Sequence, residues 1–305
     1  MIAHNNYIRE ACTSRSDVNR MKFFLSGLGN WFADLELITK TVMEADRLGF
    51  DGALMPDHYM WGETEWNKRP DSNSTLETWT TLTYLAAKTK QIRLGTLVTP
   101  IPLRPPGLLA KIVATLDILS NGRVVVGVGA GWSQPEFEGY SEWNEPKVRV
   151  NKTMEGVELM IKLWTQDKVT FNGRYYQATN AVLEPKPVQK PHPTLLFGGR
   201  GKRMLKLAGK HADICYIPPW NGTETRQKAK ETVFEEAKKH KRTGKIAFMG
   251  GGTELRGSYD SKEYSARVEA AIKDGNDYFL VSFPRMEIID SLERFARDVI
   301  PSFKC

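Results

Sequence analysis

The sequence predicts an α/β fold of the (β/α)8 TIM-barrel type, with an insertion before the fifth strand. Short runs of apolar and β-branched residues alternate with longer helical patterns, and eight such runs occur in 305 residues. This alternation predicts a parallel sheet, and right-handed crossovers leave either an open doubly wound sheet or a closed barrel. The count of eight and the length of the chain favour the barrel.

Each predicted strand is a short apolar run bounded by glycine, proline or polar residues. The predicted strands cover residues 22–29, 52–58, 92–100, 123–131, 194–199, 213–219, 246–252 and 277–283.

The helices between these strands carry start and stop signals. Asp34 is the predicted N-cap of a helix that ends at Gly49, and Thr75 is the predicted N-cap of the next helix. A third helix opens with prolines at 105–106 and closes with Asn-Gly at 121–122, the usual order of these residues at helix ends.

Residues 168–193 interrupt the alternation with a proline-rich segment of β-forming residues, which we interpret as an insertion within one domain spanning residues 21–305. Residues 1–20 lack the apolar region of a secretory signal and are expected to form a disordered extension. No apolar run reaches the roughly 20 residues needed to cross a bilayer, so we expect a cytoplasmic protein without a membrane partner.

The net charge of +7 comes from 43 lysines and arginines against 36 acidic residues. The densest basic segment, 235–245, is interpreted as the solvated end of a helix. It lacks interleaved aromatic residues, so no nucleic-acid partner is expected. Cys12, Cys215 and Cys305 are too far apart to suggest a disulfide framework or a metal site.

The second predicted strand ends in Asp57-His58. Catalytic groups of (β/α)8 barrels lie at the C-terminal ends of strands. A histidine there can exchange a proton near neutral pH, and a neighbouring carboxylate can tune the pKa or the orientation of the imidazole. In the alternative interpretation, Asp57 caps the following loop and His58 packs beneath it. Tyr59, Trp61 and Trp66 fit either the wall of a flat ligand site or ordinary loop packing.

The third strand ends in Thr99-Pro100 and is followed by Arg104 between further prolines, which predicts a stiff loop. Arg104 is suited to binding an anion or to pairing with a carboxylate on the surface, and the sequence does not separate these roles.

The fourth strand ends in a glycine-rich stretch, Gly127 to Trp132. Its G-x-G-x-G spacing, and a following proline that argues against a helix, exclude a Rossmann dinucleotide site. We interpret Gly129 and Gly131 as places where the backbone approaches a flat ligand, in preference to a tight turn. Trp132 and Glu136 are expected to project into the same neighbourhood.

The fifth strand leads into a glycine-rich turn and a helix with Lys202 and Arg203 in its first turn. Glycine amides at a helix N-terminus with cations nearby favour phosphate binding over a simple exposed turn. The spacing is not that of a Walker motif. The residues of this predicted phosphate site are Gly198, Gly199, Arg200 and Gly201.

These motifs, in this order, resemble the bacterial luciferase-like superfamily over residues 21–301. The residues that carry the resemblance are the Asp-His-Tyr of 57–59 and the segments 76–100, 103–132, 136–140 and 193–214. Within the superfamily, the chain is most similar to the oxidoreductases that use the deazaflavin coenzyme F420.

The resemblance implies a barrel with an insertion, commonly a homodimer, acting on a small-molecule substrate. It also implies a cis peptide between Leu97 and Val98, in a bulge with Thr99 that backs the deazaflavin ring. Asp57 and His58 match the pair that faces this ring in the family, and the glycine turn 198–201 matches its phosphate-binding turn.

One departure from the family concerns the substrate. The sugar-phosphate dehydrogenases of this group carry a catalytic glutamate directly after the glycines of strand four, where this chain has Trp132. Glu136 lies four residues later and is not expected to take the place of that glutamate. The absence of the glutamate argues against a sugar-phosphate substrate.

We therefore expect hydride transfer with F420, in which His58 gives or takes the paired proton and Asp57 tunes His58. An FMN-dependent monooxygenase is the alternative, and a non-catalytic ligand-binding barrel is a third hypothesis. The candidate substrate contacts are Tyr59, Trp61, Trp132 and Glu136, and the sequence does not indicate the substrate itself.

Overall fold

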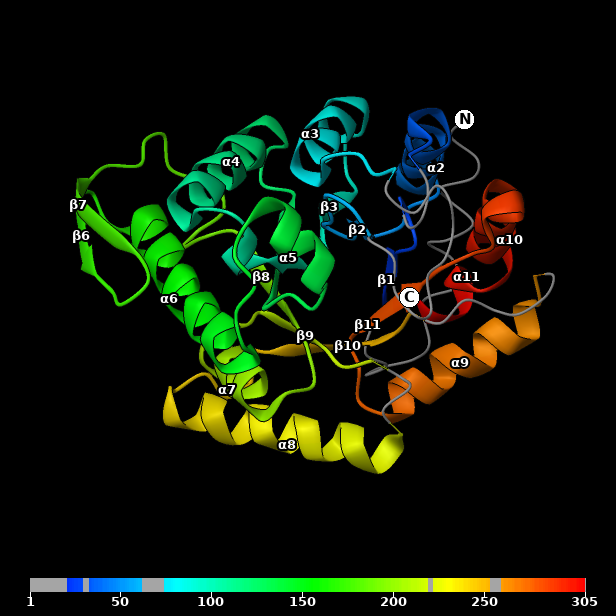
Figure 1. The fold of residues 1–305 in the computed structure, drawn as a ribbon. Helices are drawn as coiled ribbons and strands as arrows, with labels where there is room; N and C mark the ends of the chain where they lie inside the picture. The colour runs from blue at the N-terminus through cyan, green and yellow to red at the C-terminus, as the bar shows by residue number, and fades with distance from the viewer. Residues whose placement is uncertain (1–20, 30–32, 62–73, 219–221, 253–258, 305) are drawn as a thin grey trace.

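The computed structural model describes residues 21–29, 33–61, 74–218, 222–252 and 259–304. In this part of the chain a nine-stranded sheet runs in the order β3-β2-β1-β11-β10-β9-β8-β5-β4, and β3 also pairs with β5. All of these pairings are parallel, so the sheet closes on itself with helices around it (Figure 1). The predicted TIM-barrel fold is confirmed.

Every predicted strand is present, although most are shorter than the sequence suggests. The strands are β1 (Lys22–Leu25), β2 (Gly52–Met55), β3 (Arg93–Thr96), β4 (Thr99–Pro100), β5 (Val124–Gly129), β8 (Thr194–Gly198), β9 (Ile214–Tyr216), β10 (Ala247–Gly251) and β11 (Tyr278–Val281). The short β4 continues the path of β3 after a break at residues 97–98, and it pairs with the end of β5.

The helices form the outer layer of the barrel (Figure 1). They are α2 (Leu35–Arg47), α3 (Thr78–Lys88), α4 (Pro106–Leu119), α5 (Gln134–Tyr140), α6 (Pro146–Thr165), α7 (Lys202–His211), α8 (Thr223–Lys239), α9 (Ser261–Lys273), α10 (Ile288–Asp298) and α11 (Ile300–Phe303), with the 3₁₀ turns η1 (Ile101–Leu103) and η3 (Arg285–Glu287). No helix of the described residues is both long enough and apolar enough to span a membrane.

The alternation of side chains along each strand divides the core in two. Phe24 of β1 points into the barrel and joins Leu54, Val125 and Leu196, while its neighbour Phe23 points outward to the helices. Because successive side chains of a strand face opposite sides, one apolar strand supplies both cores. Cys215 faces the outer core as a buried free thiol.

The predicted insertion is confirmed. Residues between α6 and β8 form an antiparallel pair, β6 (Val169–Asn172) and β7 (Gln177–Ala181), that pairs only within itself among the described strands. It extends from one side of the barrel, beside α4 and α6 (Figure 1).

Helix ends agree with the sequence in part. Asp34 caps α2 by accepting a hydrogen bond from the Leu37 amide, and Gly49 follows with φ of +81°. The predicted cap Thr75 is wrong, because Glu77 caps α3 by accepting from the Thr80 amide at 2.6 Å. A longer carboxylate side chain reaches the amide three residues on, which satisfies one of the donors left free by the helix.

A second correction concerns residues 133–140. The sequence predicted that proline here would prevent a helix, yet α5 begins at Gln134 with Pro135 in its first turn. Proline is favourable at this position because its missing amide hydrogen has no partner in the first turn. Residues 1–20, Trp66, Cys12 and Cys305 lie outside the described residues.

Candidate active site

The predicted site residues follow the C-terminal ends of neighbouring parallel strands. Residues 57–58 follow β2, residues 97–99 follow β3, residues 129–132 end β5, and residues 198–201 end β8. Because β2, β3, β5 and β8 are adjacent in the barrel, these segments meet at one mouth.

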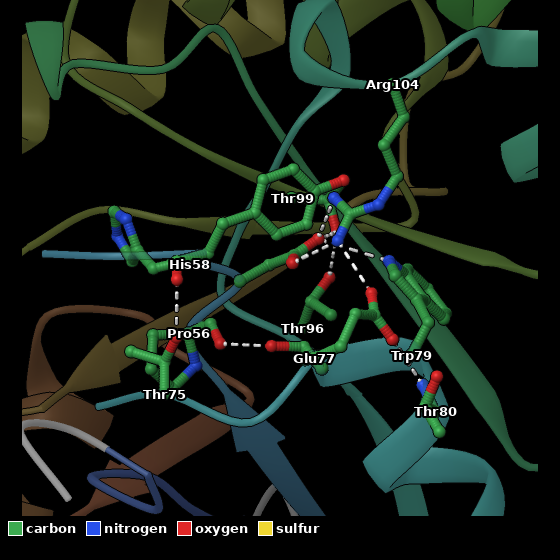
Figure 2. A network of polar contacts seen from close by, with 12 residues as sticks. Pro56, His58, Thr75, Glu77, Trp79, Thr80, Thr96, Thr99 and Arg104 are labelled. Carbon is green, nitrogen blue, oxygen red and sulfur yellow. Dashed lines mark hydrogen bonds and ion pairs between the residues drawn. The ribbon is translucent and has the colours of Figure 1, made fainter. Parts of the chain in front are cut away.

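The carboxylate of Asp57 is fully buried and forms a two-pronged ion pair with Arg104, with Nη1–Oδ2 and Nη2–Oδ1 distances of 2.8 and 2.7 Å. The Thr99 hydroxyl donates to Oδ2 at 2.7 Å and the Trp79 indole donates to it at 3.1 Å. Arg104 also donates to Glu77 at 2.8 Å (Figure 2). The network joins the end of β2 to α3, to the bulge after β3 and to the loop before α4.

The electrostatics of Asp57 reflect this burial. Loss of water raises the pKa of the Asp57 carboxyl above its ordinary value, while the charge of Arg104 and the hydrogen bonds from Arg104 and Thr99 oppose that rise. The predicted tuning of His58 by Asp57 is not what the contacts show, because the carboxylate is engaged by Arg104, Thr99 and Trp79. Arg104 pairs with the buried Asp57 carboxylate and also with Glu77, whose side chain is 41% exposed, so the exposed carboxylate partner considered from the sequence is present beside a buried one.

His58 has a different partner. Its ring points away from the Arg104 network (Figure 2), and Nδ1 lies 2.9 Å from Oε2 of Glu136. The other oxygen of Glu136 accepts from the Tyr59 amide at 2.6 Å. Glu136 is only 1% exposed and His58 8% exposed. The sequence placed Glu136 in this neighbourhood as a substrate contact, but did not show that its carboxylate would bind His58.

Aromatic rings enclose this imidazole. The Trp61 ring stacks on His58 with centroids 4.1 Å apart, and the Trp132 ring meets it edge-on at 5.5 Å. Trp132 is 46% exposed, so it forms an outer wall. Tyr59 instead faces the protein, with Arg104 above its ring at 4.5 Å, and burial raises its pKa to about 12.

The bulge after β3 contains the predicted cis peptide between Leu97 and Val98, which is confirmed. A Cβ atom on Gly129 would lie 2.4 Å from Val98 Cγ2, and one on Gly198 would lie 2.9 Å from Val98 Cγ1. The Val98 side chain therefore occupies the space that side chains on two neighbouring strands would fill.

This packing corrects the interpretation of the β5 glycines. A Cβ atom on Gly127 would lie 2.0 Å from the carbonyl oxygen of Thr96, and one on Gly131 would lie 2.4 Å from the Phe137 ring. Gly127, Gly129 and Gly131 thus make room for protein atoms, whereas the sequence suggested that Gly129 and Gly131 make room for a ligand.

The turn after β8 has the openness expected of a phosphate site. Gly199 has φ of +146°, and no heavy atom beyond the adjacent residues lies within 4 Å of the position of a Cβ on Gly201, the N-cap of α7. No side chain of the described residues caps this helix, so its first amides have no side-chain acceptor. Arg200 and Lys202 are exposed here, while Arg203 donates to the Lys147 carbonyl on α6.

The family model for luciferase-like monooxygenases matches residues 23–285. This chain belongs to that family. Members similar to it include enzymes of two cofactor classes, so membership identifies a luciferase-like oxidoreductase and leaves the coenzyme open.

Two relatives illustrate the two classes. An FMNH(2)-dependent dimethylsulfone monooxygenase from Pseudomonas putida is 31% identical, over 63% of this chain and 50% of the relative. An F420-dependent glucose-6-phosphate dehydrogenase from Amycolatopsis mediterranei is 30% identical, over 73% of this chain and 65% of the relative. This chain therefore spans between half and two thirds of the length of these curated relatives.

Solved structures show the same luciferase-like fold. An F420-dependent secondary alcohol dehydrogenase in complex with an F420-acetone adduct aligns with a TM-score of 0.79 at 21% identity, covering 92% of this chain and 99% of that one. The monooxygenase RslO1 from Streptomyces bottropensis aligns with a TM-score of 0.76 at 20% identity, covering 93% of this chain and 100% of that one.

The buried ion pair gives a first prediction. Arg104→Ala leaves the Asp57 carboxylate buried without its counter-ion, so we expect the free energy of unfolding to fall by about 3–5 kcal/mol in urea denaturation. The matched control is Lys228→Ala, which removes the exposed Lys228–Glu224 pair and should cost less than about 1 kcal/mol. Equal losses in the two variants would contradict the importance assigned to the buried pair.

The packing of Val98 gives a second prediction. Gly129→Ala should lower the free energy of unfolding by about 1–3 kcal/mol through overpacking against Val98. Adding Val98→Ala should recover part of that loss, giving a favourable coupling in a double-mutant cycle. Gly107→Ala on α4 is the control, since no heavy atom outside the local helix backbone and the adjacent residues lies within 4 Å of the new Cβ. If the changes in the free energy of unfolding caused by Gly129→Ala and Val98→Ala were additive, the contact between these two residues would be refuted.

Proposed function

We propose that this luciferase-like protein is an F420-dependent oxidoreductase that transfers a hydride between the deazaflavin ring and a small organic substrate. The observation that carries the proposal is a buried imidazole, His58, fixed on Glu136 at the barrel mouth. Hydride transfer to or from an alcohol or carbonyl compound requires a proton partner, and histidine is suited to that role near neutral pH.

The residues of the mouth fit a phosphorylated planar coenzyme. Leu97 and Val98 are partly buried and cover the top of the inner apolar core, which offers a floor for a ring. The open turn at 198–201 would hold the phosphate through the first amides of α7. When bound there, the coenzyme supplies or accepts a hydride at its ring.

The remaining steps fall to the side chains of this chain. His58 exchanges the proton that accompanies the hydride, while Trp61 covers one face of the imidazole and excludes water from it. A dry, preorganised site strengthens the interactions of the imidazole with the substrate. Asp57 acts indirectly, because its carboxylate binds Arg104, Trp79 and Thr99 and so connects the bulge to the elements around it.

The relatives support the proposal and indicate its alternative. The F420-dependent relatives favour hydride transfer, and Trp132 in place of a glutamate after β5 argues against a sugar phosphate as substrate. The FMNH(2)-dependent relative favours an FMN-dependent monooxygenase, for which the aromatic wall of Trp61 and Trp132 would also be suitable. The homodimer stays a prediction from the family resemblance, and the cytoplasmic location stays a prediction from the sequence.

Coenzyme preference is the direct test. The purified protein is titrated with F420 and separately with FMN, and the fluorescence of each cofactor is followed. We expect F420 to bind at least about tenfold more tightly, a difference of about 1.4 kcal/mol in binding free energy. Tighter binding of FMN would reject the proposal in favour of the monooxygenase.

The role of His58 gives a further prediction. His58→Asn should lower kcat with F420 by about 100-fold or more, because the proton partner is lost, while the Kd for F420 changes little. His240→Asn, at the exposed C-terminal end of α8, is the control and should leave both constants unchanged. Unaltered turnover in His58→Asn would remove His58 from the mechanism.

A further inference from the structure

The hydrogen bond between Glu136 and His58 determines which ring nitrogen of His58 carries the proton. We infer that Glu136 is a positioning residue that fixes the tautomer of His58, with the proton on Nδ1 and the lone pair on Nε2. Nε2 is then the atom that exchanges a proton with the substrate. The part of this inference that concerns turnover rests on the proposed function, and the part that concerns the tautomer does not.

The hydrogen-bond partners of Glu136 decide the tautomer. An ionised carboxylate only accepts hydrogen bonds, so Nδ1 of His58, 2.9 Å from Oε2, has to be the donor. The Tyr59 amide donates to Oε1 at 2.6 Å, so both oxygens are engaged and the carboxylate cannot rotate away without losing a donor. A neutral imidazole with its proton on Nδ1 carries its lone pair on Nε2.

Packing holds both partners in place. Glu136 lies in the first turn of α5, next to Phe137, whose fully buried ring occupies the space beside Gly131. The Trp61 ring lies nearly parallel to the imidazole, at an interplanar angle of 29°, and Trp132 meets its edge. Rotation of the imidazole would therefore require movement of neighbouring rings.

The other buried carboxylate does not compete for this role. Both oxygens of Asp57 are bound by Arg104, and one also accepts from Thr99 and Trp79. Two buried carboxylates at the mouth thus have separate partners, although Asp57 is the sequence neighbour of His58.

The chemistry of the proposed reaction fits this tautomer. For a substrate that loses a hydride from a carbon bearing a hydroxyl group, the O–H bond breaks and its proton moves to Nε2, while the hydride goes to the coenzyme and a C=O bond forms. The resulting imidazolium keeps its proton on Nδ1, which donates it in a hydrogen bond to the Glu136 carboxylate. In the reverse direction, Nε2 returns the proton to the oxygen.

The substitution Glu136→Gln tests the inference because it preserves the shape of the side chain and replaces a hydrogen-bond acceptor facing His58 with a donor. The Tyr59 amide still needs an acceptor, so the glutamine carbonyl turns to it and the amide NH2 group faces Nδ1 of His58. Nδ1 must then accept, and the proton moves to Nε2. A wrong tautomer of this kind in a catalytic triad lowers kcat by about 10⁴-fold, and we expect a fall of at least about 100-fold here.

The readout is the ¹⁵N spectrum of histidine-labelled protein at alkaline pH, with His58 assigned by its loss in His58→Asn. Wild type should show a protonated Nδ1 and an unprotonated Nε2, and Glu136→Gln should show the reverse. The Kd for F420 should be unchanged within about threefold, or about 0.65 kcal/mol, so that the effect falls on kcat.

Two variants serve as controls. Glu138→Gln changes an exposed glutamate on the same helix, bonded to Gln134, and should leave the spectrum and kcat as in wild type. Glu136→Asp keeps an accepting carboxylate and should retain the wild-type tautomer with an intermediate kcat.

The outcomes separate this inference from the proposed function. A wild-type spectrum with the proton on Nε2 overturns the inference even if Glu136→Gln does not fold. An unchanged spectrum and unchanged turnover in Glu136→Gln overturn it as well. The expected tautomers in a protein that does not bind F420 support the positioning role and reject the proposed coenzyme.

Discussion

The ion pair between Asp57 and Arg104 is the constraint on which the mouth of this barrel depends. It ties the end of β2 to the loop before α4, and through Trp79 and Thr99 it also fixes α3 and the bulge after β3. A buried pair of this kind stabilises little when compared with apolar packing, but it is costly to break. Its main effect here is to define one arrangement of four chain segments, and the position of His58 at the end of β2 follows from that arrangement.

A second set of contacts determines how the two ring nitrogens of His58 are used at the mouth. Glu136 comes from a short helix after β5, reaches across to β2, and leaves His58 with one nitrogen engaged and the other directed elsewhere. The bulge lies between these elements, with Val98 lodged against glycines of β5 and β8. Rigid strands thus carry the apolar floor and the imidazole, as expected of a site that must hold reacting groups within narrow limits.

The sequence predicted the fold well because the barrel is encoded locally. Apolar runs at strand spacing and helix end signals such as Asp34 and Gly49 need no knowledge of distant residues. The family resemblance added the cis peptide between Leu97 and Val98, which spacing alone would not indicate. The partners of Asp57 and His58 could not be predicted, since Glu136 is 78 positions from His58 and the choice between two carboxylates depends on how α5 and η1 dock. The β5 glycines were misread for the same reason, because an absent side chain looks identical whether a ligand or a valine fills its place.

Val98, in the bulge after β3, packs between Gly129 of β5 and Gly198 of β8, so its side chain fills the space in the floor that larger residues at these two glycine positions would need. A larger residue at any of these positions requires a smaller one at another. The two glycines have no side chain that could be made smaller, so only Val98 could be reduced. Substitutions that enlarge a side chain in this chain are therefore expected to be tolerated better in the loops that surround the mouth than in the floor. Engineering of new substrate preferences on this scaffold should begin with those loops and leave the three floor positions untouched.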